Sequence, residues 1–177
     1  MNKLCALKKL GFKISWNLIA IGLYGNGEIT PLITHLDVVD YLDGLLTDID
    51  EETDNIIALI CEKEDCTKFD KLLKELASED DSNTVVQKRK WRAYLLKELM
   101  DNINEDGLQG LLELMEFWVS MGKSDNCPQP FPSSDNKSVQ DYFTQASYEL
   151  ILNKNREWLN EEIQSIVKLE GSASTLR

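Results

Sequence analysis

Apolar residues recur every three or four positions along most of the chain, which is the spacing of one face of an α-helix. The first run begins at Trp16, directly after Ser15, whose side chain is typical of a helix N-cap. The glycine-containing triplet 25–27 ends this run, because glycine readily adopts the backbone conformation that follows a helix. The pattern therefore predicts a helix over residues 16–24, with Leu18, Ile19 and Leu23 on its apolar face.

The same spacing predicts five further helices before residue 123. Thr30 and Pro31 are expected to begin the first of them, with Thr30 as the cap and Pro31 at the first helical position. Ser82 and Asn104 are expected to cap the last two, and Gly122 to end the sixth helix of the chain. The five apolar faces are Val38, Val39, Leu42, Leu45, Leu46 and Ile49; Ile56, Ile57, Leu59 and Ile60; Phe69, Leu72, Leu73 and Leu76; Trp91, Leu95, Leu99 and Ile103; and Leu108, Leu111, Leu112, Met115, Trp118 and Val119.

Residues 123–137 break this pattern, because three of the four prolines of the chain lie between Pro128 and Pro132. Proline excludes helix here and favours extended backbone. The segment is interpreted as a connecting loop whose Phe131 packs on the core, with a polyproline docking ligand as the alternative. Ser138 and Asp141 resemble a capping box for a final long helix, and residues 171–177 are expected to be a flexible tail.

Strand signals are almost absent, since no alternating apolar run is bounded by hairpin dipeptides. The fold class predicted is all-α, a single domain of about seven mostly antiparallel helices arranged as a helical-hairpin array or a bundle. The 177 residues suffice for one core without a disulfide or metal. We expect this domain to span residues 13–170, after a basic N-terminal lead over residues 1–12.

Charge is distributed unevenly along this chain of formal net charge −12. Residues 14–62, here called the base-free block, contain ten acidic residues and no lysine or arginine. A helix would place Asp37, Asp40 and Asp43 along one face, opposite Val38 and Leu42. Two interpretations remain open, a solvated face or a surface that meets a basic partner. We call the candidate partner-binding set the acidic surface: Asp37, Asp40, Asp43, Asp48, Asp50, Glu51, Glu52 and Asp54.

No motif fixes a reaction, a cofactor or a metal. The acids of residues 48–52 resemble the start of a calcium loop, but Thr53 and Leu59 stand where that loop needs glycine and glutamate. A single histidine, His35, makes a zinc or di-metal site improbable, and it is interpreted as a structural or surface residue. Phosphate-binding glycine motifs are missing as well. The sequence therefore predicts no catalytic residue, no metal and no cofactor.

The basic cluster Lys88-Arg89-Lys90-Trp91-Arg92 is dispersed by helical geometry, and the chain is acidic, so nucleic-acid binding is not expected. Neither a secretory signal nor a run of apolar residues long enough to span a membrane is present. We expect a cytoplasmic protein. Its four cysteines, Cys5, Cys61, Cys66 and Cys127, are then expected to be free, buried thiols.

Two stretches carry a family resemblance, Lys13-Ile14-Ser15-Trp16 and Lys90-Trp91-Arg92-Ala93-Tyr94-Leu95-Leu96-Lys97-Glu98-Leu99. They resemble the start and the central tryptophan-containing helix of a bacterial family known as domain of unknown function 2247, over about residues 12–165. The family supplies no catalytic residues. By similarity, small acidic cytosolic proteins of such families resemble immunity proteins of bacterial toxin systems.

Three hypotheses of function follow. The first is a non-enzymatic protein-binding module, an immunity-type protein that neutralises a basic toxin domain through the acidic surface. The second is a helical scaffold or adaptor that uses apolar grooves, including as a homodimer. The third, which we favour least, is an enzyme with an unrecognised site. The sequence gives no oligomeric state.

Overall fold

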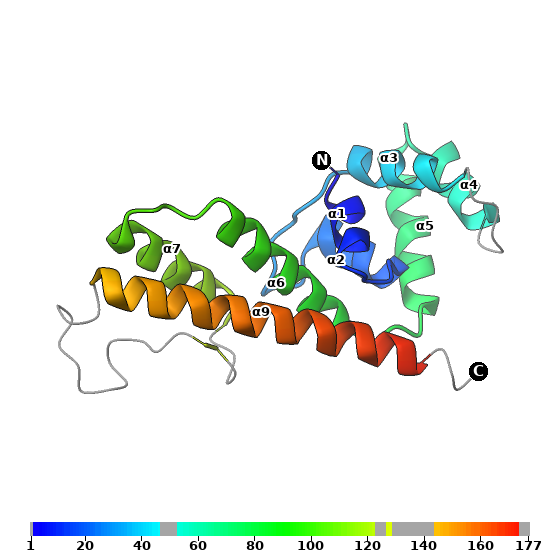
Figure 1. The fold of residues 1–177 in the computed structure, drawn as a ribbon. Coiled ribbons are helices and arrows are strands. Elements are labelled where there is room, and N and C mark those ends of the chain that lie inside the picture. The colour runs from blue at the N-terminus through cyan, green and yellow to red at the C-terminus, as the bar shows by residue number, and fades with distance from the viewer. Residues whose placement is uncertain (1, 47–52, 123–126, 129–143, 174–177) are drawn as a thin grey trace. The chain divides into compact units, whose positions relative to one another are not determined.

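The structure is a computed structural model, and it describes residues 2–46, 53–122, 127–128 and 144–173. Those residues form eight helices and no strand (Figure 1), which confirms the all-α class. Their bounds are Lys3–Lys9 (α1), Trp16–Tyr24 (α2), His35–Leu45 (α3), Thr53–Cys61 (α4), Cys66–Glu79 (α5), Thr84–Asp101 (α6), Gly107–Ser120 (α7) and Gln145–Ala173 (α9).

The chain divides into two compact units. Unit 1 comprises residues 1–91 together with residues 170–177, and unit 2 comprises residues 92–169. The division falls inside α6, between Trp91 and Arg92, and inside α9, between Leu169 and Glu170. Both helices therefore begin in one unit and continue into the other. The expectation of one folding domain over residues 13–170 stays a prediction.

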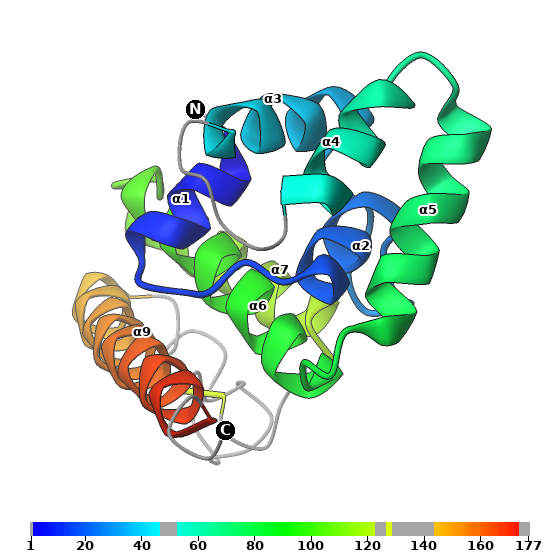
Figure 2. The same cartoon turned by 90° about the vertical axis from the view of Figure 1, so that its right-hand side faces the viewer.

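The basic lead contains a helix that the sequence reasoning missed. Asn2 caps α1 by accepting a hydrogen bond from the backbone N–H of Leu4 at 2.9 Å. Leu4, Leu7 and Phe12 are buried. α1 packs against α3 within unit 1, as Figure 2 shows, and the side chain of Asn2 donates to the carbonyl of Asp37 at 2.6 Å. The first twelve residues thus contribute to the core.

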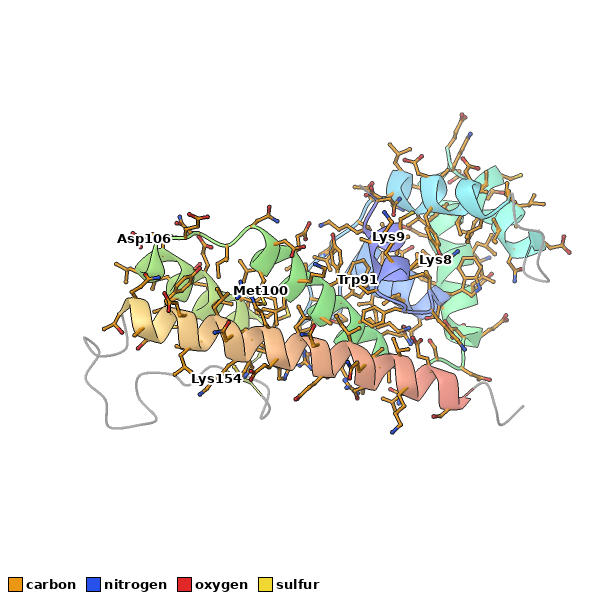
Figure 3. The ribbon with its side chains drawn as sticks, viewed as in Figure 1. Lys8, Lys9, Trp91, Met100, Asp106 and Lys154 are labelled. Carbon is orange, nitrogen blue, oxygen red and sulfur yellow. The ribbon has the colours of Figure 1, made fainter. Side chains whose placement is uncertain are left out.

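Helix α2 confirms the predicted helix over residues 16–24. The Ser15 hydroxyl accepts from the N–H of Leu18 at 3.2 Å, and Gly25 ends the helix with a φ of 75°. In the last turn of α2, Gly22 faces the indole of Trp91, labelled in Figure 3, so closely that a Cβ on Gly22 would collide with the ring. The indole N–H of Trp91 donates to the carbonyl of Leu18 at 2.9 Å. A glycine and a fully buried tryptophan therefore fix α2 on α6.

The predicted start of the next helix at Thr30 and Pro31 is wrong. α3 begins at His35, and Thr34 is its N-cap. The backbone at residues 32 and 33 is not helical because the N–H groups of both Leu32 and Ile33 donate to the carbonyl of Gly22, at 2.7 and 3.1 Å. In a helix that began at Thr30, these two N–H groups would lie in the first turn and would have no partner within the helix. They are instead paired with a residue of α2.

Helices α4 and α5 follow their predicted spacing in part. Ile56 and Leu59 are buried on α4, while Ile57 is 45% exposed. Asp65 caps α5 through the N–H of Lys68, and α5 buries Phe69, Leu73 and Leu76, with Leu72 half-buried. α5 packs along α2, so the two sequence-distant helices form one core in unit 1.

Two predicted caps are displaced by one or two residues. Asn83, rather than Ser82, accepts from the N–H of Val85 at 2.9 Å before α6. Asp106, labelled in Figure 3, caps α7 instead of Asn104, whose side chain accepts from the N–H of Asp106 at 2.9 Å. In each case a neighbouring Asn or Asp side chain takes the cap position from the expected residue.

Unit 2 is built around a buried polar pair on α7 and α9. The indole N–H of Trp118 donates to Oδ1 of Asn155 at 2.7 Å, and Asn155 is fully buried. Gly110 lets α9 approach α7 closely, since a Cβ there would collide with the ring of Tyr148 on α9. Leu108 and Val119, which the helical spacing placed on an apolar face, are about half exposed.

The remaining predictions for the C-terminal region lie largely outside the described residues. These include Phe131, most of the proline-containing loop and the Ser138–Asp141 capping box. α9 is described from Gln145, where the Thr144 hydroxyl accepts from the N–H of Ser147 at 3.2 Å. No described helix is both long enough and apolar enough to cross a membrane.

Candidate functional site

The acidic surface is described at four of its eight positions. Asp37, Asp40 and Asp43 lie on α3, and Asp54 lies in the first turn of α4. Helical spacing turns Asp40 and Asp43 away from Val38 and Leu42, which are buried. The other four positions, Asp48, Asp50, Glu51 and Glu52, lie outside the described residues.

Asp37 has a structural role as well as a charge. Its carboxylate accepts from the N–H of Thr34 at 2.8 Å and from the Thr34 hydroxyl at 2.7 Å. The Thr34 hydroxyl oxygen in turn accepts from the N–H of Asp37, which completes a capping box. These hydrogen bonds hold the pKa of Asp37 below its ordinary value, and the positive charge of Lys3 on α1 lowers it further. The negative charge of Asp37 is therefore partly compensated by groups of its own unit.

Asp40 and Asp43 differ from Asp37 in having no such partner. Both carboxylates are exposed, and neither forms an ion pair with any residue in the described part of the chain. Asp54 is exposed in the same way. Beside them on α3, Leu36 is 66% exposed, the highest value among the large apolar residues described. The solvent-facing side of α3 thus offers two uncompensated carboxylates next to an apolar side chain.

A second polar cluster centres on Asp70 of α5, and sequence reasoning missed it. Oδ1 of Asp70 contacts Nε2 of His35 at 2.7 Å and accepts from the Tyr24 hydroxyl at 2.7 Å. The His35 ring also packs edge-on against Phe69, with 5.1 Å between centroids. Tyr24, His35 and Asp70 come from three helices and are separated by 35 and 46 residues, so no local motif announces them.

The electrostatics of this cluster favour an ionised Asp70. Burial opposes its charge, but the hydrogen bonds from His35 and Tyr24 outweigh burial and lower the pKa of Asp70. Burial and the neighbouring Asp70 raise the pKa of Tyr24, which stays a neutral donor. His35 and Asp70 each keep about a third of their side chain exposed. The arrangement ties α2, α3 and α5 together at the surface of unit 1.

The basic cluster at residues 88–92 is dispersed, as the helical geometry predicts. Lys88 pairs with Glu28 at 3.3 Å, Lys90 with Glu170 at 2.6 Å, and Arg92 with Glu162 at 3.3 Å. Arg92 also stacks on the ring of Trp158. These cations have separate acidic partners and do not form one basic patch.

The cysteine prediction is partly wrong. Cys5, Cys61 and Cys66 are unbridged, yet all three are exposed rather than buried. In the described part of the chain, no group of three or more His, Cys, Asp or Glu side chains gathers at a spacing suited to a metal ion. Nothing in these residues adds a metal to the candidate site.

Comparison with known protein families gives a match over most of the chain. A family model described as "Uncharacterized protein conserved in bacteria", the domain of unknown function 2247, matches residues 5–163. No curated protein and no solved structure matches the chain significantly.

Proposed function

Because this chain belongs to the bacterial family of the domain of unknown function 2247, whose description gives no activity, we propose a function from the site itself. The chain acts by binding another protein, without catalysing a reaction. The observation that carries this proposal is the pair of uncompensated carboxylates, Asp40 and Asp43, on the exposed side of α3. They lie within a stretch of 49 residues, 14–62, that contains no lysine or arginine.

Such a surface favours a partner with a complementary positive field. Clustered charges of one sign raise association rates with an oppositely charged protein by about 10- to 1,000-fold at low salt. Exposed carboxylates at the rim of an interface act mainly on the association rate and its salt dependence. The exposed Leu36 beside them supplies apolar area that a partner can cover.

We propose that the partner is a basic toxin domain and that this chain is its immunity-type protein. An immunity protein must bind before the toxin acts, and electrostatic steering provides that speed. Cationic surfaces are common among toxin domains that act on nucleic acid, because such domains must displace counterions from phosphate. The acidic surface would then cover the cationic substrate-binding face of the toxin.

Binding to purified basic toxin domains tests the proposal. We expect salt-sensitive binding, measured by calorimetry at 50 and 300 mM NaCl. The double variant Asp40→Lys/Asp43→Lys should weaken binding at 50 mM by about ten-fold or more, because repulsion replaces attraction. Asp37 is left intact so that the capping box of α3 is preserved.

The matched control is Glu157→Lys/Glu161→Lys on α9, which changes the net charge by the same amount at two exposed positions. It should bind almost as tightly as the parent chain. Equal weakening by both double variants would mean that only net charge matters. Unchanged affinity of Asp40→Lys/Asp43→Lys would exclude α3 as the interface.

A second candidate is a helical scaffold or adaptor that uses apolar contacts. The exposed Leu36 on α3 and the 45% exposed Ile57 on α4 favour it. In its homodimer form, this candidate predicts that light scattering gives twice the chain mass at high concentration. A strict monomer at every concentration would argue against that form.

A further inference from the structure

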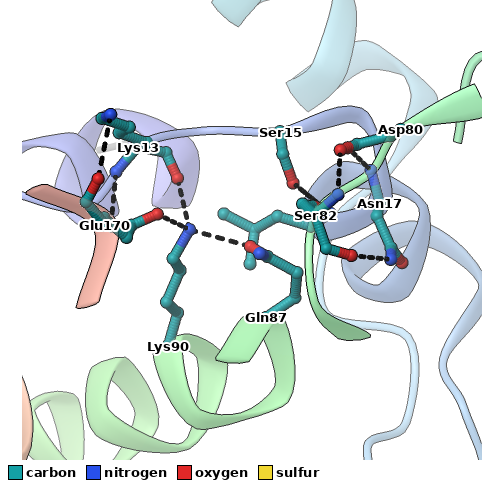
Figure 4. Close-up of polar contacts among 9 residues, drawn as sticks. Lys13, Ser15, Asn17, Asp80, Ser82, Gln87, Lys90 and Glu170 are labelled. Carbon is teal, nitrogen blue, oxygen red and sulfur yellow. Dashed lines mark hydrogen bonds and ion pairs between the residues drawn. The ribbon is translucent and has the colours of Figure 1, made fainter. Parts of the chain in front are cut away.

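Lys90 is the one cation in the described part of the chain that is fully buried. Its ammonium group donates to the carbonyl of Lys13 at 2.7 Å, to Oε1 of Gln87 at 2.8 Å and to Oε1 of Glu170 at 2.6 Å (Figure 4). An ammonium group has three N–H donors, so all of them are used. Burial lowers the pKa of Lys90, and the contact with Glu170 opposes that effect.

The two neutral acceptors orient the ammonium group, and the third proton is directed at a carboxylate. That carboxylate is held at both oxygens, because Oε2 of Glu170 accepts from the backbone N–H of Lys13 at 3.1 Å. The side chain of Lys13 donates to the backbone carbonyl of Glu170 at 3.3 Å. Only 13% of the Glu170 side chain remains exposed. A backbone N–H and a buried ammonium group thus grip one carboxylate from two directions.

The frame of this pocket is held together without α9. Oδ2 of Asp80 accepts from the N–H of Asn17 at 2.9 Å, and its Oδ1 accepts from the N–H of Ser82 at 2.8 Å. The hydroxyls of Ser15 and Ser82 are 3.1 Å apart. These contacts join the segment after Lys13 to the segment before α6, as Figure 4 shows. Glu170, in contrast, is delivered by the last turn of a helix, where local opening costs least.

We propose that Lys13, Gln87 and Lys90 form a carboxylate-binding pocket that Glu170 occupies in cis and that accepts an acidic side chain of another protein when the last turn of α9 leaves it. The pocket is separate from the acidic surface on α3 and does not depend on the function proposed for it. The ligand class is a carboxylate, since two donors fit its two oxygens and one of them is the buried ammonium group of Lys90.

Chemical rescue by acetate tests the pocket in the full chain. Glu170→Ala vacates it, and hydrogen exchange of the Lys13 amide, which Glu170 holds directly, should accelerate about ten-fold or more. Sodium acetate at 200 mM should restore at least half of the lost protection on a logarithmic scale, and sodium chloride at 200 mM should not. Glu161→Ala, at an exposed position on the same helix, is the control and should change neither rate.

A second variant separates the pocket from general stability. Lys90→Met/Glu170→Ala removes the buried charge, so acetate should have no effect on it. If Glu170→Ala alone is unfolded in chloride, the helical circular dichroism signal replaces hydrogen exchange as the readout, and acetate must restore it. The proposal is overturned if acetate and chloride act alike, or if acetate protects the double variant equally well.

Discussion

Asp70 shows how one carboxylate organises the surface of unit 1. It takes hydrogen bonds from His35 and Tyr24 through one oxygen, and Lys74 stands 4.8 Å from the centre of the Tyr24 ring. Hydrogen bonds to a charged acceptor contribute more to stability than those between neutral groups. These hydrogen bonds stabilise the ionised form of Asp70, and its pKa is lowered for this reason.

The sign of the pH dependence follows from that shift. The folded chain holds the pKa of Asp70 below its ordinary value of 3.8, so the stabilisation is present above pH 3.8 and is lost as the pH falls through the lower, folded pKa. We expect Asp70→Asn to lower the free energy of unfolding at pH 7 by about 1 kcal/mol, a modest figure because the side chain is one-third exposed. The difference between parent and variant should shrink below pH 3.8, as measured by urea unfolding across this range.

Asp43→Asn is the control for this experiment, because its carboxylate is exposed and has no ion-pair partner among the described residues. Its free energy of unfolding should follow that of the parent chain at every pH. If the difference caused by Asp70→Asn stays constant down to pH 3, the cluster does not depend on the charge of Asp70.

Single residues were predictable where the deciding partner is near in sequence. Ser15 lies three residues before the N–H that it caps, and helical spacing alone turns Asp40 and Asp43 outward. The pattern Thr34-x-x-Asp37 is a capping-box signature, so the N-cap of α3 could have been predicted from the sequence. Lys90 is different, because its burial depends on a carboxylate 80 residues further along the chain. No local pattern distinguishes it from an exposed lysine.

Helix boundaries are decided by competition between neighbouring caps. For α3, the N-cap is Thr34 rather than Thr30, because hydrogen bonds from Leu32 and Ile33 to Gly22 keep the intervening backbone out of the helical conformation. The existence of the helix follows from apolar spacing, while its first residue depends on α2. The missed helix α1 has a similar cause, since its short apolar face, Leu4 and Leu7, is recognisable only once α3 is packed against it.

Two threonine substitutions separate these starting points. Thr34→Ala removes the hydroxyl of the capping box and should lower the free energy of unfolding by about 1 kcal/mol. Thr30→Ala changes an exposed residue outside the helix and should change it by less than about 0.5 kcal/mol. Thermal or urea unfolding of both variants measures the difference. A larger loss of unfolding free energy for Thr30→Ala than for Thr34→Ala would indicate that the helix begins at Thr30, as the sequence analysis predicts.

At the scale of the whole molecule, the all-α class follows from the sequence because helical spacing persists through nearly every segment. The division into two units does not follow from it. No linker marks the division, which falls within the continuous helices α6 and α9, and the contacts that define each unit join residues far apart in sequence. Gly22 with Trp91 in unit 1 and Trp118 with Asn155 in unit 2 are such contacts.

The continuity of α6 and α9 predicts that the two units unfold together. Asn155→Ala leaves the buried indole N–H of Trp118 without its acceptor. This loss should lower the free energy of unfolding by about 1 to 3 kcal/mol. If unfolding is cooperative, the urea midpoint measured by hydrogen exchange should fall equally in α7 of unit 2 and in α3 of unit 1. Asn160→Ala, at an exposed position on the same helix, should leave both midpoints in place. A lower midpoint in α7 alone would mean that the units unfold separately and that residues 13–170 are two folding domains.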